Sequence, residues 1–232
     1  MNDSLRVPSD AQPSEGHPGL HLEELLNALT HGAGAVVALA GAAVLITLAS
    51  IYADRWAVIG ASVYGASLLL LYVASTLYHA VSHVKIKARL KVFDHCMIYV
   101  LIAGTYTPFT LTSLRGPWGW TLFGLIWGLA LAGIVFKLYY TGRFHWLSTG
   151  IYLAMGWLVV IAIEPLMKAL PQGAFAWLMA GGIAYTLGTV FYMSRRLPYA
   201  HAIWHGFVLA GSVCHFAAVL IQVLALSPAP GS

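Results

Sequence analysis

Apolar residues occupy long, nearly uninterrupted runs of this chain, and polar residues are confined to short breaks between them. A helix needs about 20 apolar residues to cross the hydrocarbon core of a bilayer. The breaks carry charge, proline or glycine, as at positions 53–55, 115–117 and 195–198. The pattern predicts seven transmembrane helices, at residues 26–50, 56–81, 92–113, 117–139, 146–165, 174–194 and 199–226.

The composition agrees with this prediction. Hydrophobic residues make up 59% of the chain and charged residues only 9%, whereas a soluble domain has about 25% charged residues. We therefore expect an all-α, polytopic integral membrane protein. Its expected organisation is a disordered cytoplasmic N-terminal tail (1–21), one seven-helix transmembrane domain (22–226) and a short C-terminal tail (227–232). The tail lacks the basic and apolar regions of a signal peptide, so we expect the first span to direct insertion.

The distribution of Lys and Arg predicts the orientation. With seven spans, nine of the twelve basic residues lie on the side of the N-terminus. These nine are Arg6, Lys85, Lys87, Arg89, Lys91, Lys137, Arg143, Arg195 and Arg196. The other side has Arg55, Arg115 and Lys168, so the positive-inside rule predicts a cytoplasmic N-terminus and a C-terminus outside. The net charge of +4 thus reflects topology, and no nucleic-acid partner is expected.

Polar side chains gather near the predicted cytoplasmic ends of four spans. They are Asn27 and His31 in the first span, Ser75 and His79 in the second, Asp94 in the third, and His201 and His205 in the seventh. An ionisable group inside a span is costly and is therefore a functional candidate by default. His201 and His205 are four residues apart, which places them on one helix face. The four spans thus predict one polar layer.

Three imidazoles beside a carboxylate are typical of a catalytic zinc site, in which a fourth position stays open for water. Ser75 is expected to support the site or its water, and Asp94 to orient or deprotonate that water.

The spacing leaves alternatives open for the ligands. His83 also lies four residues from His79 and is a rival by spacing, but it borders the basic loop and is expected to be solvated. Paired histidines can also bond across helices or line a proton path. His95 is expected to point about 100° away from Asp94 around the helix. His215, deeper in the seventh span, is expected to bond to a neighbouring helix.

The chain resembles the hemolysin III family, the bacterial branch of the progestin and adipoQ receptor (adiponectin receptor-like) superfamily. The resemblance covers roughly residues 22 to 226 and depends on three motifs in order. They are Glu24-x-x-Asn27-x-x-x-His31, Ser75-x-x-x-His79 followed by Asp94, and His201-x-x-x-His205. The resemblance implies that His79, rather than His83, joins His201 and His205 as a zinc ligand. It also implies that Asp94 contacts the zinc-bound water, with Glu24, Asn27 and His31 in supporting positions.

Two classes of function follow from this resemblance. Similarity to alkaline ceramidases implies a zinc-dependent hydrolase of a lipid amide or ester, with membrane lipids as partners and substrates. The alternative is a membrane-perturbing (hemolysin-like) or signal-sensing, receptor-like protein in which zinc is structural. Either protein would reside in the bacterial inner (plasma) membrane. A zinc ion with an open fourth position near Asp94 would indicate a catalytic site, and a zinc ion with four protein ligands would indicate a structural site.

Overall fold

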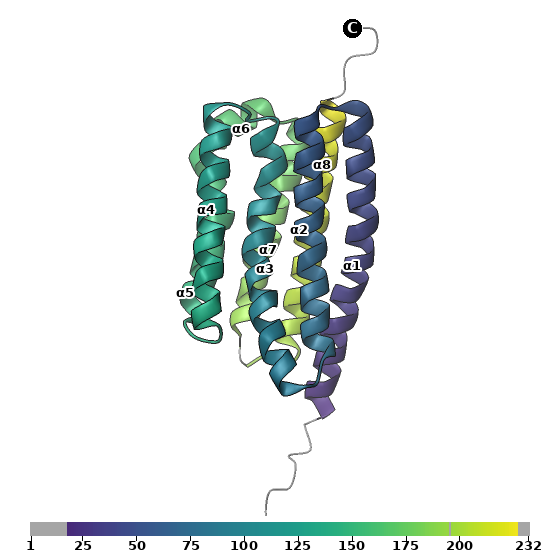
Figure 1. The fold of residues 1–232 in the computed structure, drawn as a ribbon, viewed down its shortest axis with the longest axis vertical. Coiled ribbons are helices and arrows are strands. Elements are labelled where there is room, and N and C mark those ends of the chain that lie inside the picture. The colour runs from purple at the N-terminus through teal and green to yellow at the C-terminus, as the bar shows by residue number, and fades with distance from the viewer. Residues whose placement is uncertain (1–17, 195, 227–232) are drawn as a thin grey trace, which may run out of the picture.

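The computed structural model describes residues 18–194 and 196–226, and over these residues the chain is helical without any strand (Figure 1). The elements are α1 (Pro18–Tyr52), α2 (Arg55–Ala80), α3 (Val84–Leu111), α4 (Pro117–Tyr140), α5 (His145–Gly156), the 3₁₀ helix η1 (Leu158–Ala162), α6 (Ile163–Ala169), α7 (Gln172–Met193) and α8 (Ala200–Ala225). The two described ends lie at opposite ends of the bundle, with α1 starting at the bottom of the view and α8 ending at the top (Figure 1). The predicted all-α membrane fold is confirmed.

Six segments are long and apolar enough to cross a membrane. They are Leu22–Tyr52, Arg55–Ala80, Pro117–Tyr140, His145–Ala169, Gln172–Met193 and Ala200–Ala225. The remaining long helix, α3, has 28 residues and contacts α2, α4, α5 and α8. Several polar residues of its membrane-spanning part are buried among these neighbours, including Asp94, His95 and Thr107, whereas the basic residues of its first turns are exposed or half-buried. The lower hydropathy of α3 therefore reflects its place inside the bundle, and α3 completes a set of seven spans.

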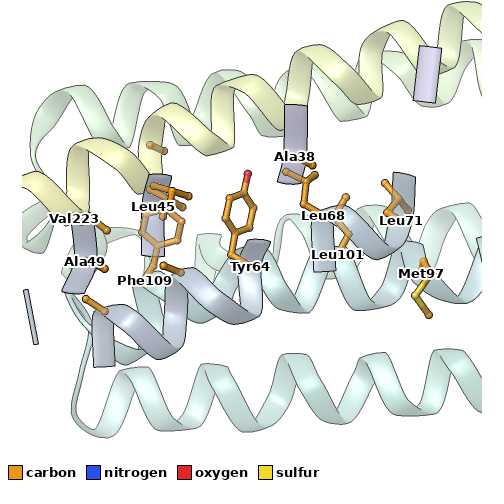
Figure 2. Close-up of a cluster of buried hydrophobic side chains, with 14 of the residues drawn as sticks. Ala38, Leu45, Ala49, Tyr64, Leu68, Leu71, Met97, Leu101, Phe109 and Val223 are labelled. Atoms are coloured by element: carbon orange, nitrogen blue, oxygen red, sulfur yellow. The ribbon is translucent and has the colours of Figure 1, made fainter. Parts of the chain in front are cut away.

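The helices pack side by side along one long axis (Figure 1), and α8 returns to contact α1. Figure 2 shows part of the main apolar core, where Leu45 of α1, Tyr64 of α2, Phe109 of α3 and Val223 of α8 meet. Helices in lipid associate mainly by close van der Waals packing. Gly60 illustrates this, because an added Cβ would lie only 2.8 Å from the Cα of Pro108 on α3.

The fifth span is broken, although residues 146–165 were predicted to form one continuous helix. Proline lacks an N–H and clashes with the carbonyl four residues earlier, so a continuous helix cannot contain Pro165 without strain. The chain instead passes through η1, and α6 starts at Ile163 with Pro165 in its first turn. The Tyr106 hydroxyl satisfies backbone groups that the break leaves without helical partners. It lies 2.9 Å from the carbonyl oxygens of Met155 and Gly156 and accepts the Val159 N–H at 2.9 Å.

Two helices begin earlier than the hydropathy pattern predicts. α1 begins at Pro18, inside the segment predicted as a tail, and the rest of that segment lies outside the described residues. α3 begins at Val84 rather than at residue 92, so the basic stretch before the span is helical. One contact that fixes this extension is made by Lys87, whose Nζ donates at 2.9 Å to Glu24 Oε2 and at 2.9 Å to the Tyr78 carbonyl.

Candidate metal centre

Three histidines from two helices converge near one end of the bundle. His79 lies in the last turn of α2, which ends at Ala80, and His201 and His205 lie in the first two turns of α8. One nitrogen of each ring lies within 4.8 Å of the nitrogens of the other two, so the three side chains could hold a metal ion between them. His79 and His205 are buried, and His201 is half-buried.

The His79 ring is oriented by a carboxylate on α1. Its Nδ1 lies 2.9 Å from Glu24 Oε2. Because an ionised carboxylate only accepts hydrogen bonds, Nδ1 carries the proton and Nε2 keeps its lone pair. This Nε2 is buried and has no hydrogen-bond partner. A carboxylate behind a histidine whose other nitrogen is free is the arrangement commonly found around metal ions in proteins.

A hydroxyl on α1 has a similar relation to His205. The Thr30 hydroxyl donates at 2.8 Å to the Leu26 carbonyl, so only its acceptor capacity is directed to His205 Nδ1, at the long distance of 3.4 Å. This contact favours a proton on Nδ1 and leaves Nε2 of His205 as the unprotonated nitrogen. The third ring, His201, has its helix position fixed by its backbone N–H, which donates to Glu23 Oε1 at 3.2 Å.

His31 packs directly on this cluster. Its ring stacks on His205 with centroids 3.5 Å apart and planes 5° apart, and it meets the edge of the Tyr72 ring at 5.0 Å. Both nitrogens of His31 are buried without a hydrogen-bond partner. His31 therefore forms a wall of the cluster.

Asp94 and Ser75 line the same cavity as His201 and His205. The Asp94 carboxylate interacts with both Ser75 and His79 and is largely buried. His95 lies beside it, with Nδ1 3.5 Å from Asp94 Oδ2, contrary to the prediction that it would point away. The same Nδ1 also donates a hydrogen bond to the Lys91 carbonyl oxygen at 2.7 Å. Helical spacing fixes where a Cβ points, but not how the ring then turns.

An apolar cavity extends from this polar cluster into the bundle. Along α3 its lining runs from Asp94 to Thr110, a distance of about 24 Å. The cavity has about 1490 Å³ of empty space, including its opening. A second hollow, lined in part by Lys91 and Arg196, shares His95 and His201 with the cavity. The histidine cluster thus lies between a basic mouth and an apolar interior that has the length of a lipid chain.

The family described as "Haemolysin-III related" matches residues 21–216. This chain belongs to the haemolysin-III related family. It is 48% identical over 198 residues to a "Hemolysin-3 homolog" of Bacillus subtilis, covering 85% of this chain and 93% of that protein. It is also 48% identical over 202 residues to a "Hemolysin-3" of Bacillus cereus, covering 87% and 92%. A human "Monocyte to macrophage differentiation factor" is 31% identical over 205 residues, covering 85% and 83%.

Family membership and the apolar helices together make this haemolysin-III related protein an integral membrane protein, and its bacterial relatives point to the plasma membrane. The structure brings together the predicted residues Glu24, His31, Ser75, His79, Asp94, His201 and His205. Asn27 is buried on α1, and its Oδ1 has no partner. The rival ligand His83 lies apart as the N-cap residue of α3. His95, which was predicted to point away from Asp94, lines the same cavity.

Proposed function

We propose that this protein is a zinc-dependent hydrolase that cleaves the amide or ester bond of a membrane lipid. The observation that carries the proposal is the position of the three-histidine cluster at the polar end of a long apolar cavity, with a carboxylate beside it. Such a cavity suits an acyl chain, and the cluster would then face the carbonyl group at the end of that chain.

Zinc fits the donor set. Neutral imidazole nitrogens are common zinc ligands, and three protein ligands leave a fourth position open in catalytic sites. The buried Nε2 of His79, which lacks any hydrogen-bond partner, supports an ion at this place because an unmade bond to a buried polar atom costs free energy. A bound zinc ion would supply a Lewis acid that polarises the carbonyl and makes water more acidic.

The chain's own residues would then move the proton. Asp94 accepts a proton from the attacking water at a carboxylate oxygen and returns it to the leaving nitrogen or oxygen as the bond to the carbonyl carbon breaks. Ser75 interacts with this carboxylate and orients it. Glu24 fixes the His79 ring, and the apolar lining binds the acyl chain and excludes bulk water. The products are a fatty acid and an amine or alcohol.

The test measures release of fatty acid from a panel of lipid amides and esters by the purified, zinc-loaded protein in detergent. Asp94→Asn keeps the shape and is expected to retain zinc but lose turnover by about 100-fold or more, because an amide is a poor base. Asp54→Asn, on the exposed α1–α2 connection, is the matched control and should turn over like the parent.

The alternative is a sensing protein with structural zinc. In that case Asp94→Asn would leave function intact, while His205→Ala would lower the thermal stability. Absence of turnover by the zinc-loaded parent on every lipid in the panel would refute the hydrolase and favour this second function.

A further inference from the structure

One more buried histidine lines the cavity far from the proposed metal ligands. His215 follows His205 in α8 by ten residues, which corresponds to about 15 Å along the helix axis. Its Nε2 lies 3.2 Å from the Leu178 carbonyl oxygen on α7. Because a carbonyl oxygen only accepts, Nε2 carries the proton and Nδ1 has a free lone pair. Nδ1 is buried and has no partner, so it is an acceptor that lacks a donor.

The ring of His215 is held in this orientation by α7. Any Cβ added at Gly181 would collide with Cδ2 and Nε2 of the imidazole, so this edge of the ring lies directly against the α7 backbone. Nδ1 is on the opposite edge, which faces away from Gly181. The predicted bond from His215 to a neighbouring helix is therefore present, and its acceptor is the Leu178 carbonyl on α7. It satisfies only one of the two ring nitrogens.

A tyrosine ring that carries a hydroxyl lies beside this imidazole. Tyr185 also lines the cavity, and its ring centroid is 5.3 Å from that of His215. Ser212 Oγ accepts the Tyr72 hydroxyl proton at 2.8 Å and lies 2.8 Å from the Tyr185 hydroxyl. Either hydroxyl can be the donor in this second contact; when Ser212 gives its proton to Tyr185, the proton of Tyr185 is left for another acceptor.

The other hydroxyls along this part of the cavity are already used. Those of Thr105 and Thr186 donate to carbonyls of their own helices, at 2.8 and 2.7 Å. Within the described residues, only His31 and His215 line the cavity and also have a buried side-chain atom without a partner. His31 packs on the histidine cluster, so His215 marks a separate polar position farther along the cavity from that cluster.

We propose that His215 and Tyr185 form a second subsite, which binds a hydroxyl group carried midway along the lipid chain in the cavity. A hydroxyl both donates and accepts, so it would give its proton to His215 Nδ1 and accept the proton of Tyr185. This inference deepens the proposed function by naming the substrate class, a lipid with a hydroxylated acyl chain, and it rests on that function for the placement of the acyl chain.

The experiment measures the affinity of the purified, zinc-loaded protein for stearic acid and for a series of its monohydroxylated isomers. For a mid-chain isomer, we expect affinity about three- to tenfold higher than for stearic acid, as one hydrogen bond would provide. His215→Leu and Tyr185→Phe should each reduce this preference toward one. Tyr99→Phe is the matched control, because it removes the hydroxyl of a buried tyrosine that packs between α3, α4 and α5 outside the cavity lining, and it should keep the preference.

Equal affinity for all isomers and stearic acid, or no binding of any of them, would overturn the proposal. A preference that survives both His215→Leu and Tyr185→Phe would also overturn it. Tyr185→Phe keeps the ring and the packing, so a folding defect in His215→Leu does not decide the result. Binding needs no turnover, so preference without hydrolysis would refute only the proposed function, and hydrolysis without preference would refute only this inference.

Discussion

Glu24 should control metal affinity through His79, although its own carboxylate is not among the grouped ligand side chains. Its Oε2 accepts from His79 Nδ1 and from Lys87 Nζ, both at 2.9 Å. The carboxylate fixes the ring so that Nε2 faces the cluster, and its negative charge strengthens the imidazole as a donor to a metal. Replacing it with a neutral group should weaken zinc binding without removing a ligand.

The size of the effect follows from which contacts are lost. Loss of such a supporting partner typically costs 10- to 100-fold in metal affinity, about 1.4 to 2.7 kcal/mol. Glu24→Gln keeps an amide oxygen that can still accept from His79, so we expect a loss near tenfold. Glu24→Ala removes both the acceptor and the charge, so we expect a loss near 100-fold.

The assay is zinc affinity by competition with a chelator, measured on purified protein in detergent. Two control variants separate ring orientation from general damage. Lys87→Met breaks the Glu24–Lys87 pair without touching His79, and Glu23→Gln keeps an acceptor for the His201 backbone N–H. Both should bind zinc within about twofold of the parent. If Glu24→Ala binds zinc as tightly as the parent, or only as weakly as Lys87→Met does, the orienting role of Glu24 is wrong.

Three further predictions concern the fold. Asp54 accepts from the backbone N–H groups of Trp56 and Ala57 as the N-cap of α2, so Asp54→Ala should lower the free energy of unfolding by about 1 kcal/mol at neutral pH. Burial raises the pKa of Asp54, but its hydrogen bonds with Ala57, Arg115 and Trp56 together outweigh this and lower the pKa below its ordinary value. The difference in unfolding free energy between parent and variant, measured in detergent, should therefore be full above about pH 4. It should vanish as the pH falls through the lowered pKa. Tyr106→Phe should destabilise the broken fifth span by about 1 to 3 kcal/mol in the same assay, because the Val159 N–H loses its acceptor. Reporter fusions at the two chain ends should give opposite signals, with the N-terminus in the cytoplasm, and equal signals would contradict the topology.

The spans could be predicted from sequence because hydropathy and helix length are local properties. The predicted bounds of the seventh span differ from those of α8 by one residue at each end, since proline and charge mark its start. The break after Gly156 could not be predicted, because the carbonyls and N–H groups freed there are satisfied by Tyr106 from another helix. The early start of α3 likewise involves contacts of Lys87 with α1 and α2.

The candidate site was predictable to the extent that it depends on depth and spacing. Counting spans places the polar side chains of α1, α2, α3 and α8 at one level, and helical spacing pairs His201 with His205. Neither depth nor spacing distinguishes His79 from His83, because the two histidines lie only four residues apart from each other at the same end of the second span. Only tertiary structure shows that Glu24 lies behind His79, that His95 turns toward Asp94 and that one nitrogen of His215 is left without a partner.

The central claim is that His79, His201 and His205 hold one zinc ion at the end of the lipid cavity. The most direct test is the metal content of the purified protein, measured by mass spectrometry after zinc loading and removal of free metal. We predict about one zinc per chain in the parent and in His83→Ala, and almost none in folded His205→Ala, because loss of one of three ligands opens the site. A parent that retains no zinc, or a His205→Ala protein that retains it fully, would contradict the assignment.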